Sequence, residues 1–173
     1  DLISPPYPGL GVALADVESL KGLLLVGCNP RKEAPLLALR IRKMVSEGGV
    51  VGAIGPRALD ANFDVAAQQC VDPSRLTGVL CDLIEKVDTG DVEPPSVLNG
   101  RLAQSVDDTD SQALADVLGQ AGPDGAIILG QYALNHRDGA ALRLAAAKLA
   151  QQTGMRLGVL APANSAGAWW AGA

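Results

Sequence analysis

Short runs of consecutive apolar residues alternate along the chain with longer stretches in which apolar positions repeat every three or four residues. The short runs show no alternation of apolar and polar positions and have the length of strands buried on both faces of a sheet. They lie at 23–26, 50–54, 126–129 and 157–160, with a less regular extended piece at 63–71. Because buried strands separated by helices form parallel sheets, the pattern predicts an α/β fold with a Rossmann-like, mostly parallel sheet and helices on both faces.

Prolines and capping residues predict where the intervening helices begin. Pro35 fits the first position of a helix, so a helix is expected to start there and 28–34 to form a loop. Three further helices are expected to begin at aspartate caps, namely Asp72 with Pro73, Asp110 (a helix through Leu118) and Asp138. The positions expected to face the core are Leu37, Ile41, Met44 and Val45, then Leu76, Val79, Leu80, Leu83 and Ile84, and finally Leu142, Ala145, Ala146 and Leu149.

The segment 89–109 interrupts this alternation with glycines, prolines and acidic residues, and it predicts a linker or a long excursion. It divides one predicted α/β domain, residues 1–173, into a front half of about 1–88 and a back half of about 110–173. The acidic residues Asp107, Asp108 and Asp110 lack the spacing of an EF-hand, and helix capping explains them better. The chain begins at Asp1 without a methionine, so a piece of a longer protein is expected.

Composition excludes several classes of function. A net charge of −5 and 3% aromatic residues argue against a basic, base-stacking groove for nucleic acid. No apolar run approaches the roughly 20 residues that cross a bilayer, so direct membrane insertion is not expected. The three cysteines match no metal or disulfide spacing, which favours free thiols in a reducing compartment and predicts no metal site.

Ligands of open α/β sheets bind at the carboxyl ends of the strands, where three loops are expected: 27–34, 130–138 and 161–167. In the first loop, Arg31 and Lys32 precede the predicted helix start and are candidates for binding an anion. The alternative is that both point into solvent or that Glu33 offsets their charge. Cys28 is expected to be a packing residue.

His136 is the single histidine, and no carboxylate is well placed to orient it, so loop hydrogen bonding or exposure is favoured over catalysis. Neither the GxGxxG, P-loop, GxSxG nor HExxH motif is present. We therefore predict no catalytic residue in this chain.

The sequence from Asp16 to Lys43 contains Gly-x-Asn-Pro-Arg-x-Glu-Ala-Pro at 27–35 and Ala-x-Arg-Ile-Arg-Lys at 38–43. Further on, Leu-Gly-Gln-Tyr-Ala-Leu-Asn-His lies at 129–136 and Ala-Asn-Ser-Ala-Gly-Ala-Trp at 163–169. These segments closely resemble the molybdopterin-oxidoreductase-like region of the large iron-sulfur subunit of bacterial NADH:quinone oxidoreductase (respiratory complex I). The resemblance covers about 15–57 and 124–173.

The resemblance implies a nucleotide-binding-type domain of the molybdopterin oxidoreductase family in which Asn29, Pro30 and Asn164 approach the cofactor's dinucleotide arms. The large iron-sulfur subunit is understood to have kept this fold and lost the molybdenum cofactor. Gly55-Pro56-Arg57 fits that loss, because many relatives have Asp-Pro-Arg at this position. A vestigial cleft is therefore expected, with no cofactor in this chain and the iron-sulfur clusters elsewhere in the subunit.

The resemblance also implies a role in NADH-to-quinone electron transfer, on the cytoplasmic side of the bacterial inner membrane as part of a membrane-associated complex. The expected partners are the remaining segments of the same subunit and other hydrophilic-arm subunits. Trp169 and Trp170 are expected to be exposed and to pack against further polypeptide. The rival hypotheses are a working pterin-dinucleotide oxidoreductase domain and a Rossmann nucleotide-binding domain without redox chemistry.

Overall fold

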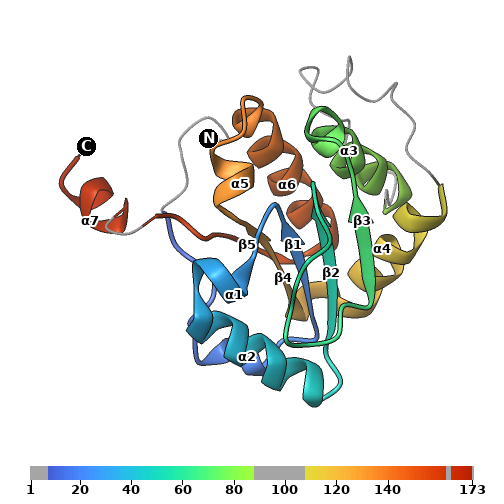
Figure 1. Ribbon diagram of the computed structural model, residues 1–173, viewed down its shortest axis with the longest axis horizontal. Coiled ribbons are helices and arrows are strands. Elements are labelled where there is room, and N and C mark those ends of the chain that lie inside the picture. Colours follow the sequence, from blue (N-terminus) through green and yellow to red (C-terminus); the bar gives the residue numbers. More distant parts are fainter. Residues whose placement is uncertain (1–7, 88–107, 163–164, 173) are drawn as a thin grey trace.

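The computed structural model describes residues 8–87, 108–162 and 165–172. Its centre is a five-stranded sheet in the order β3-β2-β1-β4-β5, and every neighbouring pair of strands is parallel (Figure 1). The strands are β1 (Gly22–Val26), β2 (Val50–Gly55), β3 (Ala67–Cys70), β4 (Gly125–Leu129) and β5 (Arg156–Val159). The predicted α/β fold with a parallel sheet is confirmed, and both halves of the chain contribute strands to the one sheet.

Helices cover the two faces of this sheet with separate clusters of buried side chains. One face packs against α3 (Leu76–Lys86), α4 (Asp108–Ala121) and α6 (Gly139–Thr153), and the other against α2 (Pro35–Ser46) and the 3-10 helix η1 (Asp16–Ser19). Leu24 and Val26 belong to the first cluster, whereas Leu23 and Leu25 belong to the second, as alternation along a strand requires. All the predicted core positions are buried except Val45, which is partly buried.

Each strand differs at a boundary from the sequence-based expectation, because the partner strand decides where pairing starts and stops. β1 and β4 each begin one residue earlier than expected, at Gly22 and Gly125, and β2 ends one residue later, at Gly55. β5 begins at Arg156, one residue before the expected run, and its four pairs with β4 end at Val159 opposite Leu129. Within the expected extended piece at 63–71, β3 comprises four residues that pair with Gly52–Gly55 at the end of β2.

The expected loop at 28–34 is wrong, because it contains a short helix, α1 (Pro30–Glu33). Asn29 caps this helix with its side chain and Pro30 takes the first helical position, the same arrangement that Asp72 and Pro73 form at the 3-10 helix η2 (Pro73–Arg75). The expected start of α4 at Asp110 is also wrong, since the helix begins at Asp108. Asp110 lies in the first turn, where the helix dipole stabilises an acidic side chain. Asp138 occupies the N-cap position of α6 without a capping side-chain hydrogen bond.

The remaining helices are η3 (Gly122–Asp124), α5 (Gln131–Leu134) and α7 (Ser165–Trp170). α7 has no buried residue and lies apart from the layered body in Figure 1. Trp169 and Trp170 are 42% and 75% exposed, as predicted. None of the helices within the described residues is long and apolar enough to cross a bilayer. The expected linker lies almost wholly at 88–107, outside the described residues.

Candidate functional site

The strand order reverses between β1 and β4, and ligands of open α/β sheets bind outside the carboxyl ends of such a strand pair. In the structure, the backbone after β1 and the backbone after β4 lie in direct contact at this position. The Gly130 N–H donates to the Val26 carbonyl at 2.9 Å, and a Cβ atom at Gly130 would lie 2.3 Å from the Cα of Cys28. The loops that follow β1 and β4 are therefore in backbone contact, and only glycine fits at position 130.

A carboxylate of the chain itself lies across this contact. Glu33 Oε1 accepts a hydrogen bond from the Asn29 N–H at 2.6 Å, and Glu33 Oε2 accepts one from the Gln131 N–H at 2.9 Å. The two amides come from the loop after β1 and from the start of α5 after β4. Partly buried Glu33 thus joins the loop after β1 to an amide 98 residues further along the chain, with one carboxylate oxygen on each.

The candidate cofactor residues Asn29 and Pro30 have roles in this local structure. Asn29 Oδ1 accepts a hydrogen bond from the Lys32 N–H at 3.3 Å, and buried Pro30 begins α1. Asn29 and Glu33 therefore both accept hydrogen bonds from backbone N–H groups at the N-terminal end of α1. The third candidate, Asn164, lies outside the described residues. Cofactor binding by these residues stays a prediction.

The anion-binding candidates Arg31 and Lys32 are both exposed. Arg31 Nη1 donates to Asp60 Oδ1 and Oδ2, each at 2.9 Å. Arg31 is therefore paired with the segment after β2 and not with Glu33, which faces the two loop amides. Anion binding by Arg31 and Lys32 also stays a prediction.

Cys28 and His136 have structural environments that match the expectation of a packing residue and a loop residue. Burial, with a further contribution from the Glu33 carboxylate, raises the pKa of the Cys28 thiol far above its ordinary value, which disfavours a thiolate nucleophile. His136 Nδ1 accepts a hydrogen bond from the Asp138 N–H at 3.1 Å, so the ring stabilises the loop before α6. Among the described residues no group of three or more histidine, cysteine and acidic side chains could hold a metal ion.

A cavity of about 150 Å³ lies beside the closed contact, at the carboxyl ends of β1 and β2. The polar and aromatic side chains in its wall are Cys28, Asn29, Glu33, Arg57, Gln68 and Tyr132. Gly55 and Pro56 also line it, and the nearest atom to a Cβ placed at Gly55 is the Arg57 carbonyl oxygen, 3.8 Å away. A side chain would therefore fit at position 55, and steric crowding does not explain the glycine there.

Comparison with known proteins gives the family of this domain. The family model for molybdopterin oxidoreductase matches residues 7–160, which is most of the chain. The chain belongs to the molybdopterin oxidoreductase family.

A solved structure also resembles this molybdopterin oxidoreductase domain. It is a chain of the formyltransferase/hydrolase complex FhcABCD from Methylorubrum extorquens, in complex with methylofuran. The TM-score is 0.51 at 15% sequence identity, and the match covers 89% of this chain and 40% of that chain. At this identity the likeness concerns the fold alone.

The residues at the reversal between β1 and β4 do not fit the pyrophosphate of a dinucleotide cofactor. The amides of Asn29 and Gln131, which would be donors for a phosphate, already bind the Glu33 carboxylate, and a second anion would be repelled by it. The adjoining cavity of about 150 Å³ is smaller than the ~300–1,000 Å³ of ligand pockets, whereas the more open hollow beside it, at 131–137, reaches that size with about 560 Å³. We therefore derive no chemical step through such a group.

Glu33 is the site residue that the sequence does not reveal, since its sequence position suggests only a partner for Arg31 and Lys32. The Asn29-Pro30 pair is the signal that could have found it. The pair predicts a helix start, and an acid within the first turn of a helix turns back towards its free N–H groups. The second partner, Gln131, has no signal in the sequence.

Proposed function

We propose that this chain is part of the large iron-sulfur subunit of a bacterial NADH:quinone oxidoreductase and serves there as a structural and interaction domain with a vestigial cofactor cleft. The motifs at 27–43 and 129–136 support the assignment to this subunit. The vestigial cleft is supported by one observation: the Glu33 carboxylate binds the Asn29 and Gln131 amides at the position where open α/β sheets bind ligands.

In this proposal the domain carries no electrons itself, and the iron-sulfur clusters lie elsewhere in the subunit. Its contribution to NADH-to-quinone electron transfer is to hold neighbouring polypeptide in place. The partners would be other segments of the same subunit and other hydrophilic-arm subunits, on the cytoplasmic side of the inner membrane.

The vestigial cleft is tested by denaturing extraction of the protein purified in its native assembly. We expect no molybdenum and no pterin dinucleotide in stoichiometric amount, with a molybdenum-containing member of the family extracted in parallel as the positive control. Recovery of one dinucleotide per chain would overturn the vestigial cleft. Absence of NADH:quinone oxidoreductase activity and of hydrophilic-arm subunits from the same assembly would overturn the assignment to complex I.

The interaction role is tested at α7. Trp169 and Trp170 form an edge-to-face pair with ring centroids 5.4 Å apart on a helix without buried residues. We expect the double change Trp169→Ser and Trp170→Ser to reduce assembly of the complex, because two exposed indoles are typical anchors of an interface. Leu14→Ser is the matched control, since Leu14 is 40% exposed and lies outside α7. Assembly at the wild-type level in the double variant would count against the role of α7.

One observation favours the alternative of a working pterin-dinucleotide domain. The open hollow of about 560 Å³ at 131–137 is large enough for a ligand. Its wall offers amides, aromatic rings and a guanidinium group, from Gln131, Tyr132, Asn135, His136 and Arg137. The extraction experiment decides between the two functions.

A further inference from the structure

Two exposed leucines lie on the outer side of α2, the helix whose inner side packs on the sheet. Leu36 is 69% exposed and Leu39 is 57% exposed, although α2 already buries Leu37, Ile41 and Met44 against the core. The two leucines are three residues apart, so their side chains lie next to each other on the helix surface. The fold leaves them uncovered among the described residues.

The chain around these leucines is rich in lysine and arginine. The α1–α2 segment, 30–46, contains five of the 14 lysines and arginines of the chain but one of its 19 acidic residues. That acid is Glu33, which faces the Asn29 and Gln131 amides. Arg31 is paired with Asp60 and Glu47 caps the C-terminal end of α2, so the excess positive charge of the segment rests on Lys32, Arg40, Arg42 and Lys43.

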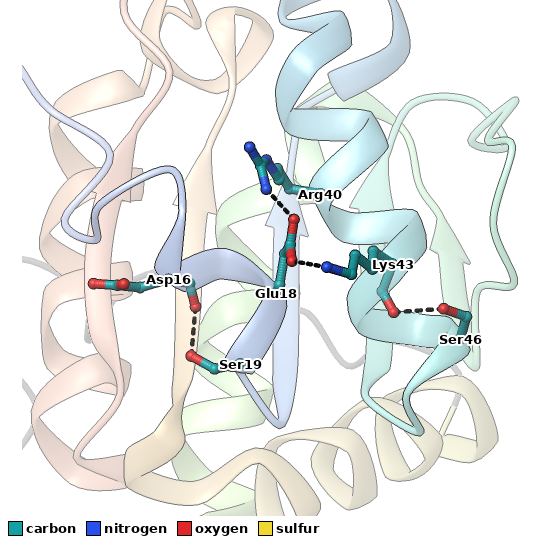
Figure 2. Close-up of polar contacts among 6 residues, drawn as sticks. All are labelled: Asp16, Glu18, Ser19, Arg40, Lys43 and Ser46. Carbon is teal, nitrogen blue, oxygen red and sulfur yellow. Dashed lines mark hydrogen bonds and ion pairs between the residues drawn. The ribbon is translucent and has the colours of Figure 1, made fainter.

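Part of this positive charge stays unneutralised. Arg40 and Lys43 share the single carboxylate of Glu18, as Figure 2 shows. Within the described part of the chain, the side chains of Lys32 and Arg42 form no ion pair. We call the set of Leu36, Leu39, Arg42 and Lys43 on α2, together with Lys32 on the preceding helix α1, the outer α2 face.

We propose that the outer α2 face docks an acidic amphipathic polypeptide segment, in which apolar residues contact Leu36 and Leu39 and flanking aspartates or glutamates pair with Lys32 and Arg42. The inference rests on the interaction role proposed above and names a surface other than α7. α2 has 12 residues, so its exposed side is about 18 Å long and matches about three turns of a partner helix.

Charge and shape favour a polypeptide over other polyanions. Nucleic acid is bound through stacking rings as well as cations, and residues 30–46 contain no aromatic residue. Two leucines offer little apolar area for insertion into an anionic membrane, because the inner stripe of α2 is already buried.

The test places a photo-crosslinking amino acid at Leu39 of the protein in its native assembly, and mass spectrometry identifies what is captured. The matched position is Gln120, an exposed residue of α4 on the opposite side of the sheet. We expect Leu39 to capture one polypeptide segment with apolar residues flanked by acids, and Gln120 not to capture it. Capture of lipid, nucleic acid or a second copy of this chain at Leu39, or no capture, overturns the proposal.

Charge reversal gives a second readout in the same assembly. Arg42→Glu should reduce the crosslink yield at Leu39 by about tenfold or more at low salt, because it sets like charges against each other. Arg156→Glu, at an exposed position of edge strand β5, changes the net charge equally and should leave the yield unchanged. Equal yields in the two variants would overturn the predicted acidic flanks.

The outcome also separates this proposal from the assignment to complex I. An acidic amphipathic segment captured in an assembly without complex I subunits supports the docking face and overturns the assignment. A complex I assembly in which Leu39 captures nothing overturns the docking face alone.

Discussion

Single side chains decide how the sheet is closed at the carboxyl ends of β1 and β4. Glu33 reaches an amide on each side of the closure, and Gly130 lets the two backbones touch. Asn29 completes the arrangement by capping α1, which carries Glu33. A glutamate of the chain itself therefore binds backbone amides at the edge of the sheet where P-loop and Rossmann folds bind a phosphate.

We predict that Glu33→Gln loosens this closure. The amide side chain keeps one acceptor oxygen but turns an N–H₂ group towards the second backbone donor, so one hydrogen bond is lost. Since a hydrogen bond to a charged group contributes about 1.5–3 kcal/mol, amide hydrogens in 27–34 and 130–136 should exchange about tenfold faster or more. Hydrogen-exchange mass spectrometry measures this, with exposed Glu85→Gln as the control. Unchanged protection of these amides from exchange in Glu33→Gln would contradict the bridging role of the Glu33 carboxylate.

Cys28 is predicted to be unreactive at neutral pH, because burial and the Glu33 carboxylate raise the pKa of its thiol. Exposed Cys70 should react with N-ethylmaleimide first, and Cys28 at least about tenfold more slowly. In Glu33→Gln the Cys28 rate should rise but stay below that of Cys70, since burial is the larger cause. Equal rates for Cys28 and Cys70 in the folded protein would show that Cys28 is a reactive thiol.

At the scale of elements, η1 is joined to α2 by one acid and two cations. Glu18 accepts hydrogen bonds from Arg40 and Lys43, which lie one turn apart on α2 (Figure 2). The hydrogen bonds from Lys43 and then Arg40 lower the pKa of Glu18 below its ordinary value, and Glu18 raises the pKa of Lys43. The ion cluster therefore favours the docked position of η1 while all three groups are charged.

The lowered pKa of Glu18 gives a pH dependence with a definite sign. The cluster stabilises the fold at pH values above the ordinary pKa of 4.5, and this contribution is lost as the pH falls through the lower pKa of the folded state. The wild type should be more stable than Glu18→Gln at neutral pH, and the difference should shrink in acid.

Urea denaturation at a series of pH values measures this difference. Asp16→Asn is the control, because Asp16 is an exposed acid of the same 3-10 helix. A stability difference for Glu18→Gln that is independent of pH would contradict the assigned ion cluster.

At the scale of the whole molecule, the sheet separates two buried clusters that share no side chain. Adjacent Leu24 and Leu25 are both fully buried, yet one packs with α3, α4 and α6 and the other with α2 and η1. The two faces should therefore respond independently to changes in packing.

We predict that Leu24→Ala and Leu25→Ala each lower the free energy of unfolding by about 2–5 kcal/mol and that their effects add in the double variant. Leu24 and Leu114 form the contrasting pair, because both approach the space above Gly52 from the same face, so Leu24→Ala with Leu114→Ala should be non-additive. Urea denaturation of the single and double variants measures both. A coupling energy above about 1 kcal/mol between positions 24 and 25 would contradict the separation.

The fold was predictable wherever the signal is local. Buried apolar runs indicated the strands, and the stripe of Leu37, Ile41 and Met44 indicated the buried side of α2. Strand β5 was misplaced by one residue because β4, far away in the sequence, decides where it pairs. The site was predictable only as a set of loops, since the sequence does not say which of them touch.

The sequence by itself determined the class of fold, the faces of the helices and the family, because apolar spacing, capping residues and the 27–43 motif are properties of neighbouring residues. The tertiary structure alone decided the strand order and the closure of the loops after β1 and β4. It also decided that Glu33 meets an amide 98 residues away and that Leu36 and Leu39 stay uncovered. These features depend on contacts between distant segments, and such contacts exist only once both sides of the sheet have packed.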